Sequence, residues 1–358
     1  MEKNFTKDGL ILLNKSKGVS SFGAINHLKK VMKAKKVGHA GTLDPMAEGL
    51  MIVMINEATK FSDNLMKKDK EYYVEMELGY KTDTYDLEGT VIAKYDSEIN
   101  ISDSEIIQAV NSFKGKIKQV PPMYSAIKIE GQKLYDLARK GIEVERAERD
   151  VEILEIREIK VIRPDENSEN AQNIKISFYA KVSSGTYIRS LVYDIGEKLG
   201  VFATMTRLVR TKIGRFEIED AISLEKAKAE IDKLKNLMEG KTENESFWAT
   251  KNDSAIRAEK IREIVCFVEI EYVLDYYGIN ISNVKYGKLK NGMTVIDTFK
   301  KFENISKEAS KGANVRENQK FKIYVRNKNT NVREFKGIVK IVSIRGDRIY
   351  LKRDKYFL

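Results

Sequence analysis

The sequence predicts a mixed α+β protein with two domains, and three observations support this fold class. Apolar and polar residues alternate over 72–78 and 174–182, which is the pattern of half-buried strands. Apolar residues recur at helical spacing over 22–32 and 188–199. The chain has 358 residues, 42% hydrophobic and 33% charged, so it can bury a sizeable core and form more than one domain.

The predicted elements of the N-terminal part follow in order. Residues 9–15 form an apolar run that predicts a buried strand, and a turn with glycine and serine then leads into the helix at 22–32. Gly200 lies directly after the helix at 188–199 and is suited to end it. Residues 228–263 are strongly charged, which predicts helices around a flexible linker.

The C-terminal part is basic and predicts short strands, the clearest at 321–325 and 335–341. Residues 285–358 contain 20 Lys and Arg but 7 Asp and Glu, a net charge of +13, whereas the rest of the chain nets −2. A basic module on a near-neutral body indicates a polyanionic partner, nucleic acid before membrane. The alternative is a lysine-rich tail that only aids solubility.

Several classes of protein are disfavoured by composition. The longest apolar run, residues 50–55, is too short to span a membrane, and the first eight residues lack the apolar segment of a signal peptide. One cysteine, Cys266, and two histidines make a zinc cluster improbable, and no phosphate-binding glycine motif occurs. We therefore expect a cytoplasmic protein without cofactor or metal.

The most informative stretch is residues 38–50, in which Asp44 lies between glycines and a proline. Gly38 and Gly41 allow backbone angles that other residues resist, and Pro45 disfavours helix at the residue before it. Asp44 is therefore expected on a rigid loop, which suits a reacting group. Spacing alone also allows Asp44 to be the N-cap of a helix that begins at Pro45.

The ungapped string Gly-His-Ala-Gly-Thr-Leu-Asp-Pro at 38–45 resembles the signature of the TruB family, the tRNA pseudouridine-55 synthases. Strings that resemble this family extend over roughly 9–215. They include the segments 81–89, 119–131, 186–189 and 205–214. The chain departs from the family at Ser16, where proline is usual, and at Lys81, where arginine is common, which puts a bidentate pairing there in doubt.

The resemblance implies a role for each of several residues. Asp44 corresponds to the catalytic nucleophile, and Arg189 to the arginine that pairs with it and keeps it charged and aimed. Substrate-contacting positions are implied for the histidine of the Gly-His dipeptide, for the tyrosine that stacks on the base, for the tyrosine of the Thr-Tyr-Ile-Arg string in the first turn of the second helix and for the uridine-pocket leucine. These are His39, Tyr72, Tyr187 and Leu208.

Other interpretations remain open from the residues themselves. Glu48, four residues after Asp44, would be the second carboxylate of a glycosidase, but we interpret it as a residue on a helix surface. Tyr72 and Leu208 would be ordinary core residues, and His39 a structural support. The alternative function is a non-catalytic tRNA-binding or tRNA-folding protein.

The resemblance also implies the organisation of the molecule. Residues 1–230 would form a pseudouridine synthase domain with a central, largely antiparallel sheet, and 231–283 a charged helical linker. Residues 284–358 resemble a PUA-type RNA-binding β-barrel. The expected reaction is isomerisation of uridine to pseudouridine at position 55 in the T-loop of tRNA, on a flipped-out base. The expected partner is the tRNA T-stem-loop, and a monomer without an obligate protein partner is expected.

Overall fold

The computed structural model describes the parts of the chain that carry the predicted site. The described residues are 8–32, 34–125, 127–129, 131–164, 174–227, 229, 267–269, 271, 276–298, 302, 315–327 and 329–357. Cys266 and nearly all of the charged stretch 228–263 lie outside them. Within the described residues, no helix is both long enough and apolar enough to cross a membrane.

The chain divides into two compact units, one formed mainly by residues 11–267 and the other mainly by 268–358. The expected helical linker at 231–283 contains two described strands, β15 (Phe267–Glu269) and β16 (Tyr277–Asn280), so these residues differ from the expectation. In β16 the reason is pairing: it lies parallel to a strand of the C-terminal sheet, which supplies partners for its backbone.

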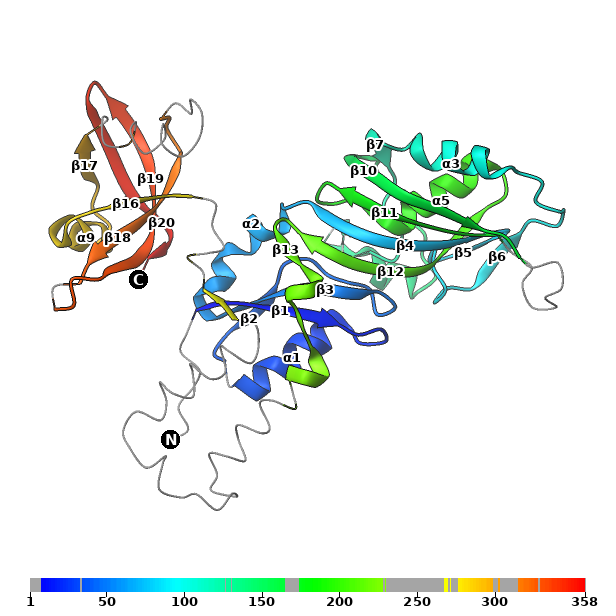
Figure 1. Ribbon diagram of the computed structural model, residues 1–358, viewed down its shortest axis with the longest axis horizontal. Helices are drawn as coiled ribbons and strands as arrows, with labels where there is room; N and C mark the ends of the chain where they lie inside the picture. Colours follow the sequence, from blue (N-terminus) through cyan, green and yellow to red (C-terminus); the bar gives the residue numbers. More distant parts are fainter. Residues whose placement is uncertain are drawn as a thin grey trace, which may run out of the picture. The chain divides into compact units, whose positions relative to one another are not determined.

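The first unit is built on a large mixed sheet (Figure 1). Its strands run in the order β14 (Ile222–Ser223), β1 (Gly9–Lys15), β3 (Glu48–Ile55), β12 (Ala203–Ile213), β4 (Lys70–Leu78), β11 (Lys175–Val182), β10 (Arg149–Ile162) and β7 (Gly115–Gln119). β4 pairs antiparallel with both β11 and β12, and β10 pairs antiparallel with β11 and β7. The β1–β14 and β3–β12 pairs of this path are parallel, whereas the pairs from β12 through β4, β11 and β10 to β7 are all antiparallel, so the sheet is largely antiparallel, as expected.

Helices pack on this sheet through apolar residues at helical spacing, although Phe22, the first residue of the pattern over 22–32, is exposed. α5 (Ile188–Leu199) turns its apolar residues into a core that it shares with β4, β11 and β12, and Gly200 ends it in a left-handed conformation. α1 (Ser21–Met32) packs on β1 and β3 through a second core. α3 (Asp103–Asn111) begins with a capping box at Ser102.

Shorter elements connect the main strands. They are β2 (Val37–His39), the 3-10 helix η1 (Asn56–Phe61), α2 (Ser62–Met66), β5 (Tyr80–Thr82), β6 (Val91–Lys94), β8 (Lys128–Ile129), β9 (Gln132–Lys133), α4 (Leu134–Ala138), β13 (Phe216–Glu217) and the 3-10 helix η2 (Ile218–Asp220). β2 pairs with β3, and β5 with β6. The loop between β2 and β3 carries Asp44, and the turn between β5 and β6 carries Asp86.

The second unit contains a separate five-stranded sheet with its own core. The strands lie in the order β16, β18 (Lys320–Arg326), β19 (Arg333–Arg345), β20 (Arg348–Phe357) and β17 (Val295–Thr298). α9 (Asn283–Lys290) begins after Ser282, whose hydroxyl accepts a hydrogen bond from the Lys285 backbone. The predicted class, mixed α+β with a large antiparallel-rich sheet and separate C-terminal β-structure, is confirmed.

One local expectation is wrong, and one alternative that spacing allowed is not realised. No helix begins at Pro45: the Asp44 carbonyl accepts a hydrogen bond from the Ala47 amide 3.1 Å away, which closes a four-residue turn. Glu48 does not lie on a helix surface, because it is the first residue of β3. The misplaced helix has a physical reason, since aspartate followed by proline suits a turn as well as a helix start.

Candidate active site

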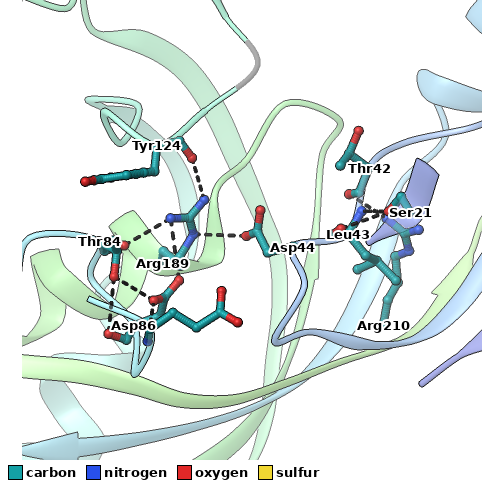
Figure 2. A network of polar contacts seen from close by, with 10 residues as sticks. Ser21, Thr42, Leu43, Asp44, Thr84, Asp86, Tyr124, Arg189 and Arg210 are labelled. Carbon is teal, nitrogen blue, oxygen red and sulfur yellow. Dashed lines mark hydrogen bonds and ion pairs between the residues drawn. The ribbon is translucent and has the colours of Figure 1, made fainter. Parts of the chain in front are cut away.

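The loop that carries Asp44 is held to the N-terminus of α1. The Ser21 hydroxyl donates to the Leu43 carbonyl at 2.8 Å and accepts from the Leu43 amide at 2.9 Å (Figure 2). Both polar groups of the residue before Asp44 are thereby fixed. The turn at Pro45 fixes the backbone on the other side, so the Asp44 backbone is held from both directions.

A buried arginine also supports the loop that carries Asp44. Arg210 in β12 is 1% exposed, and its guanidinium donates to the carbonyls of Leu50 at 2.7 Å, Gly41 at 3.1 Å and Thr42 at 3.4 Å. β3 and β12 approach closely at Gly49, which pairs with Arg210. A Cβ at position 49 would lie 2.4 Å from the Arg210 carbonyl oxygen. Arg210 therefore ties both ends of the loop to the centre of the sheet.

Lys15, at the end of β1, is also buried and faces carbonyl oxygens. Its ammonium donates to Val19 at 2.7 Å, Ser16 at 3.0 Å and Pro45 at 3.3 Å. Burial lowers the pKa of Lys15 to about 8, although the charge of Asp44 opposes this change. The cation thus joins the turn after β1 to the turn that follows Asp44.

Asp44 forms an ion pair with Arg189 from the first turn of α5. Arg189 Nε lies 3.0 Å from Asp44 Oδ2, and Figure 2 shows the two side chains facing each other. The Arg189 side chain is 5% exposed, whereas that of Asp44 is 36% exposed. The carboxylate therefore keeps access to a ligand while its partner is fixed within the protein.

The Arg189 guanidinium is itself held in place by three further oxygens. Nη1 donates to the Thr84 carbonyl at 3.0 Å, and Nη2 to the Tyr124 carbonyl at 2.7 Å. Asp86, 3% exposed, lies 3.5 Å from Nη1. This arrangement leaves the Nε edge for Asp44, so the orientation of the guanidinium sets the position of the carboxylate (Figure 2).

Asp86 is supported by the turn between β5 and β6. It accepts hydrogen bonds from the Thr84 hydroxyl at 2.6 Å and the Glu88 amide at 3.0 Å. Burial raises the pKa of Asp86, and the Thr84 hydrogen bond and the charge of Arg189 oppose that rise. The turn is anchored to α5, because Tyr85 stacks on Tyr193 with ring centroids 4.3 Å apart.

The other predicted contact residues differ in their degree of burial. His39 ends β2 opposite Val53, and burial lowers the pKa of its imidazole, so it is neutral at pH 7. Tyr72 is 9% exposed and Leu208 6% exposed, and both belong to the core cluster that includes Leu43. Among the predicted residues, Asp44 and Arg189 form an ion pair.

Tyr187 is the N-cap residue of α5, two positions before Arg189. Its backbone exchanges two hydrogen bonds with the Gln119 side chain, at 2.8 and 3.0 Å. Burial raises the pKa of the Tyr187 phenol, interaction with the Ser125 hydroxyl and the charges of Arg149 and Arg189 oppose this rise, and the charge of Asp44 adds a smaller increase. The hydroxyl is therefore a neutral hydrogen-bonding group within the electrostatic range of the carboxylate.

Glu48 forms an ion pair with Arg207, whose Nε lies 3.3 Å from Glu48 Oε2. Arg207 also pairs with Glu75 at 3.4 Å. The residues that the structure describes contain no cluster of acidic, histidine or cysteine side chains that could hold a metal ion. What the site can offer is a single accessible carboxylate in a fixed orientation, which suits attack on an electrophilic carbon.

Sequence reasoning missed Asp86 and Arg210 as parts of the site, although both lie in quoted strings. A signal existed for Arg210, because residues two apart on a strand share a face and one interpretation of Leu208 was an ordinary core residue. An arginine on an inward face requires buried acceptors. Asp86 gave no such signal, since its partner Arg189 is 103 positions away and the fold alone brings them together.

Comparisons with known proteins agree with this geometry. A model described as the TruB family pseudouridylate synthase N-terminal domain matches residues 29–188, and one described as the tRNA pseudouridylate synthase B C-terminal domain matches 189–258. The tRNA pseudouridine synthase B of Fusobacterium nucleatum is 50% identical over 212 residues, which cover 59% of this chain and 70% of that protein. That of Clostridium perfringens strain 13 is 46% identical over 291 residues, 81% of this chain and 85% of the relative.

Among solved structures, the crystal structure of a Cbf5-Nop10-Gar1 complex contains a similar chain, with a TM-score of 0.62 and 22% identity. The match covers 98% of this chain and 85% of that one, and at this identity it shows the fold alone. The pseudouridine synthase fold expected for the first unit is confirmed. The chain therefore belongs to the TruB family of pseudouridine synthases, which isomerise uridine to pseudouridine in tRNA.

Proposed function

We propose that Asp44 is the nucleophile with which this enzyme isomerises uridine 55 in the T-loop of tRNA. The observation that carries the proposal is the geometry of one ion pair. Asp44 is accessible and lies 3.0 Å from a guanidinium that three other oxygens orient. A carboxylate held charged and aimed in this way can attack without first reorganising its surroundings.

The target base is stacked inside folded RNA and has to be flipped out, at a cost of a few kcal/mol. In the proposal, the neutral His39 braces the space that the base vacates, and the base then meets the Tyr72 ring and the Leu208 side chain. Support comes from the core cluster to which Tyr72, Leu208 and Leu43, the residue before Asp44, all belong. Tyr187 offers a hydroxyl to the bound uracil.

The chemistry balances without any co-reactant, because substrate and product are isomers. Asp44 adds to the sugar C1′ or to the base, the N-glycosidic bond breaks, and the uracil turns while it stays bound. C5 then bonds to C1′, the C5 proton leaves to Tyr72 or to water, N1 of the uracil takes up a proton from water, and the Asp44 carboxylate is regenerated. Two electron pairs exchange partners, and no net oxidation occurs.

The decisive test is the Asp44→Asn variant on an unmodified tRNA transcript. We expect tRNA binding to persist while tritium release from C5-labelled uridine falls on the order of 10⁴-fold or more, as when other enzymes lose their nucleophile. The matched control is Glu48→Gln, which removes a neighbouring carboxylate that is paired with Arg207. Full turnover by Asp44→Asn would refute the assignment.

The same assay separates the two alternatives. A non-catalytic tRNA-binding protein gives no tritium release in the wild type, and a glycosidase that uses Asp44 with Glu48 gives free uracil or a cleaved sugar. We expect a product of unchanged mass that reacts with carbodiimide at position 55. Loss of activity in Glu48→Gln together with free uracil would favour the glycosidase.

We also propose that residues 284–358 act as a PUA-like tRNA-binding module and that the enzyme works as a cytoplasmic monomer. The separate five-stranded sheet and the net charge of +13 over residues 285–358 support the first point. Light scattering of the enzyme with and without tRNA tests the second, and a stable dimer would contradict it.

A further inference from the structure

The exposed face of α1 combines an aromatic ring with lysines. Phe22 is 68% exposed, although large aromatic side chains are usually buried. Lys29 and Lys30 are also exposed, whereas Ala24, Ile25 and Leu28 on the opposite face are buried in the core with β1 and β3. Positions 22, 26, 29 and 30 recur at helical spacing, so Phe22 and the two lysines form one stripe.

The segment around this stripe carries no acidic residue. Between Asp8 and Asp44 the sequence has seven lysines and neither aspartate nor glutamate. Of the residues that the structure describes, none forms an ion pair with Lys29 or Lys30. Exposed lysines without carboxylate partners attract a polyanion, and the first acidic residue reached along the chain is the proposed nucleophile itself.

The stripe begins at the nucleophile loop. Ser21, the first residue of α1, holds the backbone of Leu43 through two hydrogen bonds (Figure 2). Phe22 follows Ser21 directly in the sequence. A helix of 12 residues is about 18 Å long at 1.5 Å per residue. The lysines therefore lie along a line that starts next to Asp44 and runs a distance comparable to a few nucleotides.

We propose that this face of α1, defined by Phe22, Lys29 and Lys30, binds the RNA strand next to the flipped uridine. Phe22 stacks on a neighbouring base, and the two lysines contact backbone phosphates. Stacking on an exposed ring tolerates any base, and lysine contacts with phosphate release counterions. The inference rests on the proposed function, because it places the stripe beside the attack by Asp44 on a tRNA uridine.

The ring is tested by Phe22→Ala, with Phe22→Leu and Phe22→Tyr as companions. Loss of a stacked base weakens binding of an unmodified tRNA transcript, and raises KM, roughly 5- to 100-fold. We expect Phe22→Leu to behave like Phe22→Ala, and Phe22→Tyr to restore binding. Since the ring is exposed, kcat and the midpoint of thermal unfolding should stay close to wild type. The matched control is Ile162→Ala, which truncates a side chain 57% exposed at the end of β10.

The lysines are tested by the double variant Lys29→Ala/Lys30→Ala over 50–200 mM salt. Each lost phosphate contact should reduce the slope of log K against log salt by about 0.7 to 0.9. The control pair is Lys114→Ala/Lys116→Ala, which removes two exposed lysines at β7, the opposite edge of the sheet from β1. We expect a shallower slope only for the α1 variant.

The outcomes distinguish a failure of the proposed function from a failure of the RNA-binding role assigned to α1. A wild-type enzyme that neither binds tRNA nor releases tritium would overturn the proposed function. An active wild-type enzyme whose Phe22→Ala variant binds tRNA normally, or whose lysine variant keeps the wild-type salt slope, would overturn the assignment of α1. Equal recovery of binding by Phe22→Leu and Phe22→Tyr would also overturn the assignment of α1. It would indicate apolar packing, such as packing against a protein partner, and not base stacking.

Discussion

Arg189 shows how one side chain can define a site. Its Nε, Nη1 and Nη2 atoms each have a separate acceptor, so the position of the Asp44 carboxylate depends on a planar, forked cation. A lysine ammonium carries its three N–H groups on one nitrogen, so it cannot reach acceptors that are spaced around the fork of a guanidinium. The two carbonyl contacts, from Thr84 and Tyr124, are as important to this geometry as the ion pair.

Arg189→Lys should therefore keep the charge and lose the activity. We expect turnover to fall about 100-fold or more, because a small misplacement of a reacting group costs that much. Single-turnover tritium release measures it. Arg207→Lys is the control, since Arg207 is about half exposed and pairs with Glu48 and Glu75 outside the ion pair of Asp44. Equal activity of wild type and Arg189→Lys would contradict the role given to the guanidinium.

Lys15 makes the stability of the protein depend on pH. Burial lowers its pKa from 10.5 to about 8 in the folded state, so between pH 8 and 10.5 the unfolded chain binds more protons than the folded one. The contribution of Lys15 to the free energy of unfolding therefore rises with pH across this window, by about 1–3 kcal/mol.

Urea unfolding of wild type and Lys15→Met at pH 7.5, 9 and 10.5 measures this contribution. The difference, wild type minus variant, should increase with pH, since methionine does not titrate. A difference that is constant or falls over this window would show that the buried ammonium is not the cause.

At the scale of elements, the site depends on the parallel pair of β3 and β12. Gly49 has a φ of +103°, and a Cβ there would lie 2.4 Å from the carbonyl oxygen of Arg210. The two strands can approach this closely only because the residue is glycine. That approach lets the Arg210 side chain reach the carbonyls of the loop that carries Asp44.

Gly49→Ala should separate these strands and weaken both stability and activity. We expect a loss of about 3 kcal/mol or more in the free energy of unfolding, since backbone must move and the residue is also strained. Gly115→Ala is the matched control: φ is +105°, and nothing lies within 4 Å of the added carbon. The difference between the two variants isolates the steric effect, and equal losses would contradict it.

At the scale of the whole molecule, charge is divided between a near-neutral catalytic part and a basic C-terminal part. Nucleic-acid affinity that depends on lysines falls with salt, whereas attack on a base already bound does not. The enzyme should therefore lose tRNA affinity as salt rises and keep its rate at saturating tRNA.

Lys288→Ala/Lys352→Ala tests the C-terminal contribution, because both side chains are exposed in the second unit. The slope of log K against log salt should become shallower by about 1 to 2, with kcat unchanged. A wild-type slope in this variant would mean that these two lysines do not contact phosphates.

The sequence by itself determined the family, the reaction and the place of Asp44 on a loop, because contiguous motifs such as residues 38–45 carry this information. It also determined most elements, since alternation and helical spacing are local patterns. The local prediction at Pro45 remained ambiguous, because aspartate before proline suits both a turn and a helix start. Glu48 was misplaced for the same reason.

Only the tertiary structure decided which groups surround the carboxylate. Arg189 meets Asp86 and the carbonyls of Thr84 and Tyr124, and Arg210 lies buried under the loop. These partners come from strands, turns and a helix that are distant in sequence. No local pattern records which buried cation faces which oxygen, since that pairing follows from strand order and register, which the packing of the whole sheet determines.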